Sequence, residues 1–403
     1  MRSVTEPPET LEGKFESRRF DLPETYAPRQ RKVPGGEIAS PTIISTMLLE
    51  GIFPPITTPF YPDGKLYLRK LEHNVALYSR TQLSGMVVLG STGEAVMLSS
   101  EEQREVLATA IASASPEKVM MAGVGQESVR QTLTLAELAG SLHYDAVLVR
   151  TPHFYRKQLH RSDGPQLEML TYYRTVADRS PLPVLLYNVP IFTNYDMPVD
   201  LIAELAHHPN IIGIKESSGN VENIAAIVKA TKFAKRTVTV TTTFTAVTQR
   251  MLSAQPANSA TRFVAADALQ QGSSAVAVAA PPAAMKTRQK EVGFTVLTGG
   301  AGTIHAALRE GASGAVVAFA TCAPQCCCEI WMAWKEGDDG LAAEKQERIR
   351  AASGIVGGQM GVPGLKFACD LNGYYGGRAR LPLLPLTAEQ QQEVTRLMAD
   401  IRY

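Results

Sequence analysis

The sequence predicts an α/β protein built on a (β/α)8 TIM barrel with a C-terminal helical extension. Two observations support this prediction. Short apolar segments, rich in branched residues and of strand length, alternate along the chain with longer segments of helical periodicity. Polar side chains follow several of the apolar segments directly, which is typical of the rim where barrel enzymes assemble their chemistry.

The expected elements follow one another in a regular order. Eight strands are expected at residues 51–56, 86–89, 119–124, 146–150, 184–187, 211–215, 294–297 and 315–320. The clearest helices lie between them, at 66–78, 101–114, 129–142, 166–176, 199–207, 221–232 and 303–310. An open doubly wound sheet is the alternative. It would need a phosphate-binding turn, and neither Gly-x-Gly-x-x-Gly after the first strand nor a P-loop lysine motif occurs.

The 403 residues exceed the ~250 of a lone barrel, so additions to the barrel are expected. Residues 1–48 are rich in Pro, Glu and Arg, and we expect a flexible N-terminal extension there. Residues 49–325 are assigned to the barrel. Residues 326–403 are assigned to the eighth helix and the helical extension, with helices at 326–334, 340–352, 363–371 and 387–401.

A low-complexity insertion at about 236–293 interrupts the barrel between the sixth helix and the seventh strand. Connections of this kind usually take about 2–6 residues. The insertion contains a Thr/Val run at 237–244 and an Ala/Val run at 275–282. Three interpretations stay open: a surface protrusion, an interaction module, or untranslated sequence that is absent from the mature protein. As a helix-to-strand connection, it should emerge at the face opposite the active site.

Composition narrows the class of protein. Hydrophobic residues make up 45% and charged residues 20%, and the net charge of +1 argues against a nucleic-acid partner. No apolar run approaches the ~20 residues needed to cross a bilayer. The early glutamates Glu6, Glu9 and Glu12 are unlike a mitochondrial transit peptide, so a cytoplasmic location is expected, with a mitochondrial one as the alternative.

No metal site is predicted. The five cysteines lack the two spaced pairs of a zinc site, and we expect them to be reduced thiols. A metal-dependent barrel enzyme would need converging histidine and carboxylate ligands. His153 and His305 lie near predicted strand ends without such a pattern.

The expected strand at 211–215 ends in Lys215. An ammonium is costly to bury among apolar residues, because desolvation favours the neutral amine. A neutral amine is what a Schiff-base nucleophile requires. The alternative is a structural lysine whose head reaches water at the strand end. Two other strands also end in polar groups, with Tyr187 after one and Ser91 and Thr92 after the other, so a shared site at the rim is predicted.

Three motifs resemble the pyruvate-dependent class I aldolase and lyase family that includes dihydrodipicolinate synthase and N-acetylneuraminate lyase. They are Gly90-Ser91-Thr92-Gly93-Glu94, Tyr187-Asn188-Val189-Pro190 and Gly213-Ile214-Lys215-Glu216, in the family's order. The resemblance extends from about Gly51 to the C-terminus, apart from the insertion. The segments 361–366 and 373–377 look most like the 4-hydroxy-2-oxoglutarate aldolase branch.

The resemblance implies a role for each matching residue. Lys215 would form the imine with a 2-oxo acid, and Tyr187 would carry the proton that leaves or joins the substrate hydroxyl. Ser91, Thr92 and Gly93 would hold the 2-oxo acid's carboxylate, since a turn that leads into a helix offers exposed N–H donors. Val316 matches a position that lines the pyruvate pocket.

Two departures from the family pattern affect the second substrate. Phe192 stands where dihydrodipicolinate synthase has an arginine that grips its aldehyde's carboxylate, which weakens that assignment. Phe154 stands where the family often has a proton-relaying tyrosine that reaches a neighbouring subunit. Either Tyr155 substitutes for it, or the relay runs through water or the substrate. His153 is a further possible polar contact.

The leading interpretation is a class I aldolase that cleaves or forms a 4-hydroxy-2-oxo acid or a 2-keto-3-deoxy sugar acid, with pyruvate or glyoxylate as one partner. A dihydrodipicolinate synthase-type synthase or dehydratase is the alternative, and a catalytically silent scaffold is the alternative from another class. The resemblance implies a homotetramer. No cofactor is expected, because the imine itself serves as the electron sink.

Overall fold

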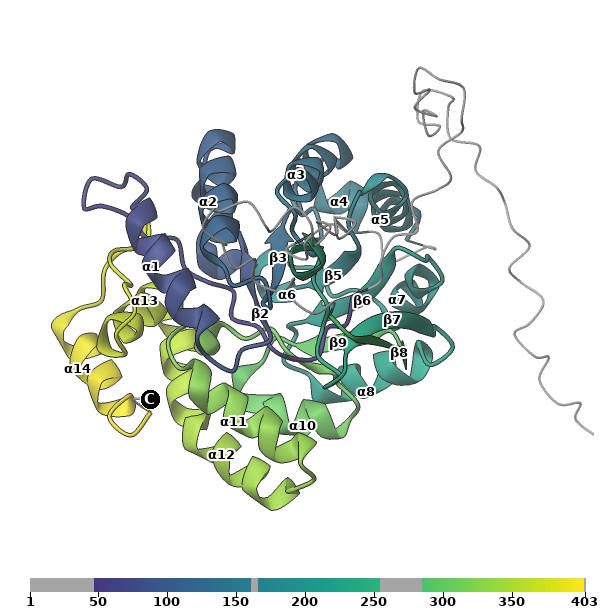
Figure 1. The fold of residues 1–403 in the computed structure, drawn as a ribbon. Coiled ribbons are helices and arrows are strands. Elements are labelled where there is room, and N and C mark those ends of the chain that lie inside the picture. The colour runs from purple at the N-terminus through teal and green to yellow at the C-terminus, as the bar shows by residue number, and fades with distance from the viewer. Residues whose placement is uncertain (1–46, 161–165, 254–284, 402–403) are drawn as a thin grey trace, which may run out of the picture. The chain divides into compact units, whose positions relative to one another are not determined.

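A computed structural model describes residues 47–160, 166–253 and 285–401 (Figure 1). Residues 1–46 of the expected N-terminal extension and the Ala/Val run at 275–282 lie outside the described residues. In the part of the chain that is described, no helix is long and apolar enough to span a membrane.

Eight parallel strands form one sheet in the order β1-β10-β9-β6-β5-β4-β3-β2. They are β1 (Gly51–Ile52), β2 (Gly85–Val88), β3 (Val119–Gly123), β4 (Ala146–Arg150), β5 (Val184–Asn188), β6 (Ile211–Glu216), β9 (Thr295–Thr298) and β10 (Gly314–Ala315). The two ends of the sheet meet at a parallel bridge between Pro55 and Val87, where the Ile56 amide donates to the Val87 carbonyl at 3.0 Å. The bridge brings the sheet close to a closed ring, which confirms the predicted (β/α)8 barrel.

Helices surround the ring, and more helices follow it at the C-terminus (Figure 1). Those around the ring are α1 (Leu68–Ser79), α2 (Ser100–Ser113), α3 (Val129–Ser141), α5 (Leu167–Arg179), α7 (Val199–Ala206), α8 (Val221–Ala230), α10 (Ile304–Arg309) and α11 (Pro324–Lys335). The C-terminal helices are α12 (Asp339–Ala352), α13 (Gly361–Leu371) and α14 (Ala388–Leu397). Two short helices, α4 (Arg156–Leu159) and α6 (Pro190–Thr193), follow β4 and β5.

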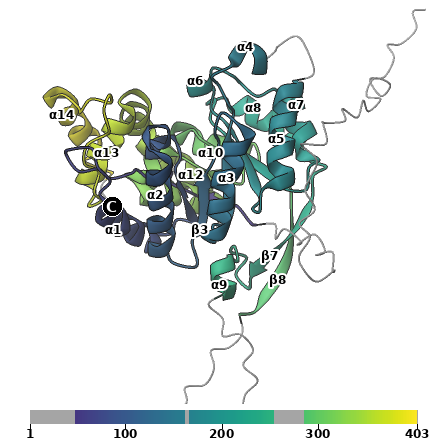
Figure 2. The ribbon, with the colours of Figure 1, turned by 90° about the horizontal axis from the view of Figure 1, so that it is seen from above.

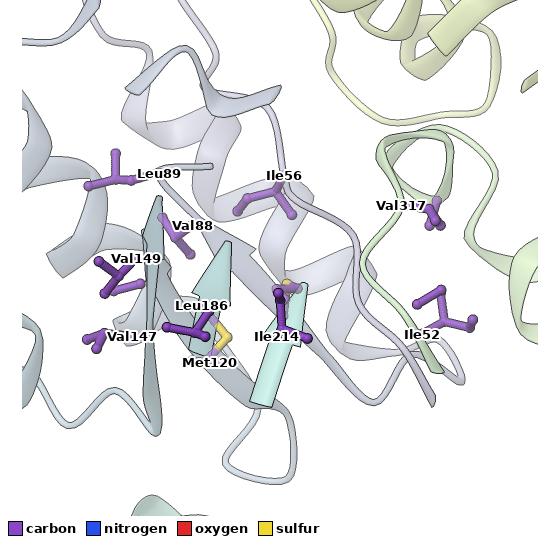
Figure 3. Close-up of a cluster of buried hydrophobic side chains, with 14 of the residues drawn as sticks. Ile52, Ile56, Val88, Leu89, Met120, Val147, Val149, Leu186, Ile214 and Val317 are labelled. Carbon is purple, nitrogen blue, oxygen red and sulfur yellow. The ribbon is translucent and has the colours of Figure 1, made fainter. Parts of the chain in front are cut away.

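The apolar core has two parts, because successive side chains of a strand point to opposite faces. One part lies between strands and helices, where Val88, Val147 and Ile214 are fully buried (Figure 3). The other fills the barrel and includes Leu148, Tyr187 and other inward-facing side chains. The strands are buried on both faces, which explains why they appear in the sequence as continuous apolar runs.

The first and last barrel strands are shorter than expected. The first was expected to reach residue 56 but ends at Ile52, because Pro54 and Pro55 have no N–H to donate to a ladder. The last was expected at 315–320 but ends at Ala315, and Ala318–Thr321 forms a 3-10 helix. At the rim the chain has to turn toward α11, so the apolar run continues as a turn and not as a strand.

A buried ion pair joins the C-terminal helices to the rim of the barrel. Lys366 on α13 is 1% exposed, and its Nζ lies 2.6 Å from Oε1 of Glu94 in the turn after β2. The same Nζ donates to the carbonyls of Thr58 and Arg378. Burial lowers the pKa of Lys366, and the negative charge of Glu94 offsets part of that shift. The helical extension therefore holds the turn that carries Ser91.

The described ends of the insertion lie at the opposite end of the barrel from α4 and α6 (Figure 2). Strands β7 (Arg236–Thr241) and β8 (Thr287–Val292) pair antiparallel, and the short helix α9 (Gln249–Ser253) follows β7. Val238 and Val240 are buried against Leu48. These apolar contacts make this part of the insertion a packed element of the fold.

An arginine attaches α9 to the amino ends of the strands. Arg250 donates to the carbonyls of Ala114, Ser115 and Lys118, which precede β3, and its guanidinium lies 3.7 Å from Oδ2 of Asp145. Asp145 also accepts the backbone N–H of Met120. Burial raises the pKa of Asp145 to about 6, although Arg250 and the backbone donors oppose the rise.

The raised pKa of Asp145 gives a prediction for pH dependence. The native state binds this proton more tightly than the unfolded chain, so the contribution to stability is greatest below the unfolded pKa and is lost as pH rises through about 6. Between pH 5 and pH 7 this group should remove about 1 kcal/mol from the free energy of unfolding. Asp145→Asn should abolish that loss in urea titrations at the two pH values.

The matched control for this experiment is Glu105→Gln, which removes an exposed carboxylate from α2. The control should show the same change in the free energy of unfolding between pH 5 and pH 7 as wild type. Lost hydrogen bonds change the stability of Asp145→Asn at both pH values alike, so only the difference is diagnostic. If the free energy of unfolding changed equally between pH 5 and pH 7 in Asp145→Asn and in wild type, the pH dependence would not come from Asp145.

The ion pair gives a second stability prediction. Lys366→Met leaves the Glu94 carboxylate buried and unpaired, which should cost about 3–5 kcal/mol. The double variant Glu94→Gln/Lys366→Met leaves no buried charge and should be markedly more stable than Lys366→Met alone. Urea denaturation of the two single variants and the double variant measures the coupling. Strictly additive losses would show that the pair is not coupled.

Candidate active site

Parallel pairing places three functional side chains at one level of the rim. Arg150 on β4 pairs in register with Tyr187 on β5, and Tyr187 pairs with Lys215 on β6. Neighbouring strands are about 4.8 Å apart, and residues in register project toward the same side of a sheet. Leu148, two residues before Arg150, belongs to the barrel interior with Tyr187. All three side chains therefore start from the inner face of the rim.

Lys215 lies against the phenol ring of Tyr187. Its Nζ is 4.1 Å from the ring centroid, and the residue is only 5% exposed. Tyr187 is buried as well, and its hydroxyl lies 3.3 Å from Oγ of Ser91. Strands β5 and β6 and the turn after β2 thus bring the amine, the phenol and the hydroxyl together, as the sequence predicts for Lys215, Tyr187 and Ser91.

The turn after β2 leaves backbone donors open. Ser91–Gly93 forms one turn of 3-10 helix, in which Thr92 and Gly93 are buried. Within the described ranges, no hydrogen bond uses the backbone N–H of Ser91 or Thr92. Open N–H groups at a turn of this kind suit a carboxylate.

The same turn is strained and is held from outside. Leu89 and Glu94, which flank it, have φ of 59° and 56°, and left-handed backbone is unfavourable for side chains other than glycine. Thr58 donates from Oγ1 to the Gly93 carbonyl at 2.7 Å, and Glu94 forms the ion pair with Lys366. These contacts fix the position of Ser91 relative to Tyr187.

A buried polar network fixes the ends of β5 and β6. Nδ2 of Asn188 donates to Oε2 of Glu216 at 2.8 Å and to Asp196 at 2.6 Å. The backbone N–H of Ser218 donates to the other oxygen of Glu216. Burial raises the pKa of Glu216, and these hydrogen bonds oppose the rise. Glu216 and Asn188 follow Lys215 and Tyr187 directly, so the network keeps the two functional side chains in register.

The remaining predicted residues lie in different surroundings. Val316 is fully buried among the side chains that fill the barrel. Phe192 on α6 is 64% exposed, and Tyr155 before α4 is 61% exposed and packs edge-on against Phe154. Among the described contacts of this chain, neither Phe192 nor Tyr155 reaches Tyr187 or Lys215.

A small cavity of about 40 Å³ opens beside Tyr187. Its lining includes Ser91 and Tyr187 together with glycines and apolar residues of the β2, β3 and β4 ends. Arg150 is the one charged residue among the described residues that line it. The cavity therefore offers a short polar edge, an apolar wall and one positive charge.

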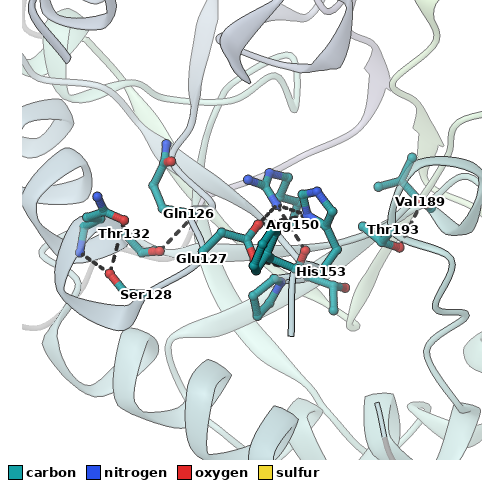
Figure 4. Close-up of polar contacts among 12 residues, drawn as sticks. Gln126, Glu127, Ser128, Thr132, Arg150, His153, Val189 and Thr193 are labelled. Carbon is teal, nitrogen blue, oxygen red and sulfur yellow. Dashed lines mark hydrogen bonds and ion pairs between the residues drawn. The ribbon is translucent and has the colours of Figure 1, made fainter. Parts of the chain in front are cut away.

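Arg150 was not predicted as a site residue, although the sequence carried a signal for it. It ends an expected apolar strand in the same way that Lys215 does, and the same argument applies to both. Its partners could not be predicted. His153 is three residues away in the chain, but Glu127 comes from the connection after β3, and only the folded barrel brings it to Arg150 (Figure 4).

The described residues contain no group of three or more His, Cys, Asp or Glu side chains that could hold a metal ion. The cysteines Cys322, Cys326, Cys327, Cys328 and Cys369 are free and buried. Burial raises the pKa of the Cys328 thiol to about 12, so this thiol is protonated at neutral pH.

Comparison with known proteins identifies the family. The model of the dihydrodipicolinate synthetase family matches residues 48–271 and 276–401. A 4-hydroxy-tetrahydrodipicolinate synthase from Methanothrix thermoacetophila is 26% identical over 88% of this chain and 98% of its own length. One from Methanosphaerula palustris is 36% identical over 46% of this chain, a match that spans 61% of that relative.

Comparison with solved structures supports the barrel fold. The crystal structure of a dihydrodipicolinate synthase from Bacillus anthracis superposes with a TM-score of 0.67 at 22% identity, over 89% of this chain and 100% of the other. At this identity the likeness establishes the shared fold. With the family match over most of the chain, the protein belongs to the dihydrodipicolinate synthetase family.

Proposed function

We propose that this enzyme is a class I aldolase or synthase that forms an imine between Lys215 and a 2-oxo acid such as pyruvate. The supporting observation is the buried amine of Lys215, which lies 4.1 Å from the ring centroid of Tyr187 at the rim of the barrel. A desolvated lysine amine is a nucleophile suited to imine formation, and the adjacent phenol could transfer a proton. Ser91 and the open N–H groups of its turn would take the substrate carboxylate.

The proposed cleavage follows from the imine. The Lys215 amine attacks the substrate ketone, and loss of water gives a protonated imine. A base removes the proton of the C4 hydroxyl, the C3–C4 bond breaks, and its electron pair moves into the imine to give an enamine and a free aldehyde. Protonation of C3 and hydrolysis by water release the shortened 2-oxo acid and restore the amine. Tyr187 is the proposed carrier of the hydroxyl proton.

The preferred substrate class is a 4-hydroxy-2-oxo acid or a 2-keto-3-deoxy sugar acid, cleaved to or formed from pyruvate or glyoxylate. A synthase of the dihydrodipicolinate type is the second candidate, since a relative aligned over 88% of this chain carries the name 4-hydroxy-tetrahydrodipicolinate synthase. Both candidate reactions pass through the enamine, and they differ in the aldehyde that is released from it or reacts with it. Phe192 weighs against the second candidate, because it stands where the resemblance places the arginine that dihydrodipicolinate synthase uses for its aldehyde. The homotetramer and the cytoplasmic location stay predictions.

Borohydride trapping tests the imine. Wild-type protein treated with pyruvate and borohydride should gain one reduced pyruvyl group on Lys215, detected by peptide mass spectrometry. Lys215→Ala should gain none, and Lys229→Ala, which changes an exposed lysine on α8, should label like wild type. An unlabelled, folded wild type would refute the aldolase and synthase proposals and favour a silent scaffold.

Substitution of the phenol tests the proton transfer. Tyr187→Phe removes the hydroxyl that contacts Ser91. It should lower kcat by about 100-fold or more while trapping with pyruvate persists, because general acid–base catalysis contributes about 10²–10⁴-fold. Tyr155→Phe is the comparison. An equal fall in that variant would assign the relay to Tyr155 as well, and an unchanged kcat in Tyr187→Phe would remove Tyr187 from the mechanism.

A further inference from the structure

We infer that Arg150 binds a second carboxylate, carried by the aldehyde half of the substrate, and so makes the enzyme selective for 2-oxo acids with an anionic tail. This inference rests on the proposed imine at Lys215 and names the substrate class of the same site. Arg150 lies two strands from Lys215, on the far side of Tyr187. The two backbone positions are therefore about 10 Å apart, a distance that the side chains and a substrate of glutarate length span together.

The guanidinium is held on one side and open on the other. Nη1 donates to Oε1 of Glu127 at 3.0 Å and to the Thr151 carbonyl at 3.3 Å, and lies 2.9 Å from Nδ1 of His153 (Figure 4). None of the hydrogen bonds found in the described part of the chain involves Nε or Nη2 of Arg150. These N–H groups are available to a ligand, and a guanidinium suits a carboxylate through paired donors.

Glu127 acts as a fixed support for Arg150. Its Oε2 accepts the backbone N–H groups of His153 and Phe154, each at 2.9 Å, and its Oε1 lies 2.8 Å from Nδ1 of His153. Burial raises the pKa of Glu127, but the backbone donors and Arg150 outweigh that effect and lower the pKa overall. Glu127 is therefore ionised at neutral pH, and its oxygens are occupied by donors of the protein.

Arg150 provides the positive charge in the lining of the cavity beside Tyr187. Arg150 lines the same cavity as Tyr187 and Ser91, and the other described lining residues carry no charge. The side chain is 16% exposed, so solvent screens it less than a surface arginine. A tail that leaves the imine past Tyr187 meets neutral side chains, among them the polar Ser91 and Gln126, and one cation. An anionic tail should therefore be favoured over a neutral one of the same size.

Two substrates that differ in one group test the inference. The acids 4-hydroxy-2-oxoglutarate and 4-hydroxy-2-oxopentanoate share the reacting atoms and carry a carboxylate or a methyl group at the tail. Wild type should cleave the dicarboxylate with the higher kcat/KM. Arg150→Met should lower kcat/KM for the dicarboxylate by about 10- to 100-fold, mostly through KM, and change it for the monocarboxylate by less than about 3-fold.

Two further variants separate binding from folding. Arg150→Lys keeps the charge and should restore part of the preference, while Arg156→Met removes an exposed arginine of α4 and should behave like wild type. Borohydride trapping with pyruvate measures imine formation separately from cleavage of the two substrates. If every variant traps pyruvate but Arg150→Met loses both substrates equally, Arg150 is only structural and the inference fails. If wild type does not trap pyruvate, the proposed function itself fails.

Discussion

The closure of the parallel ring is the constraint on which the rest of this structure depends. Parallel strands that close on themselves put all their carboxyl ends on one rim, and their register then decides which side chains share a level. Here the register aligns Arg150, Tyr187 and Lys215 on three neighbouring strands. No single segment of the chain could bring these groups together. The site follows from the hydrogen-bond ladder, and its chemistry follows from the residue at the end of each strand.

Polar contacts outside the ring then position the rim. The turn after β2 has residues with left-handed backbone at both sides, and it is held by Thr58 and by the buried pair of Glu94 and Lys366. The ends of β5 and β6 are joined by the amide of Asn188 and the carboxylate of Glu216. Glu94 and Lys366 pair with each other, and Glu216 accepts hydrogen bonds from Asn188 and Ser218, which offsets part of the cost of burying these groups. The C-terminal helices thus contribute to the geometry of the site through Lys366.

The insertion and the candidate site use opposite ends of the barrel. The described parts of the insertion pack on the connections that precede β3 and β4, where Arg250 contacts three carbonyls and Asp145. In barrel enzymes that end serves stability and the other serves chemistry. The Thr/Val run forms a strand with Val238 and Val240 buried, which reduces the hazard that an exposed run of this composition would present.

The sequence by itself determined the class of fold and the chemistry at the strand ends. Apolar runs fully buried on both faces predict a parallel barrel, and Lys215 and Tyr187 stand out because each ends such a run. Pro54 and Pro55 already indicated an early end of the first strand. Local pattern could not predict the shortened last strand, since the rim decides where its apolar run turns into a 3-10 helix at Ala318–Thr321. The partnerships of Arg150 with Glu127 and of Lys366 with Glu94 join segments distant in the chain. Only the tertiary structure decided them, because the energy of a charge pair depends on distance and burial, which the order of residues does not contain.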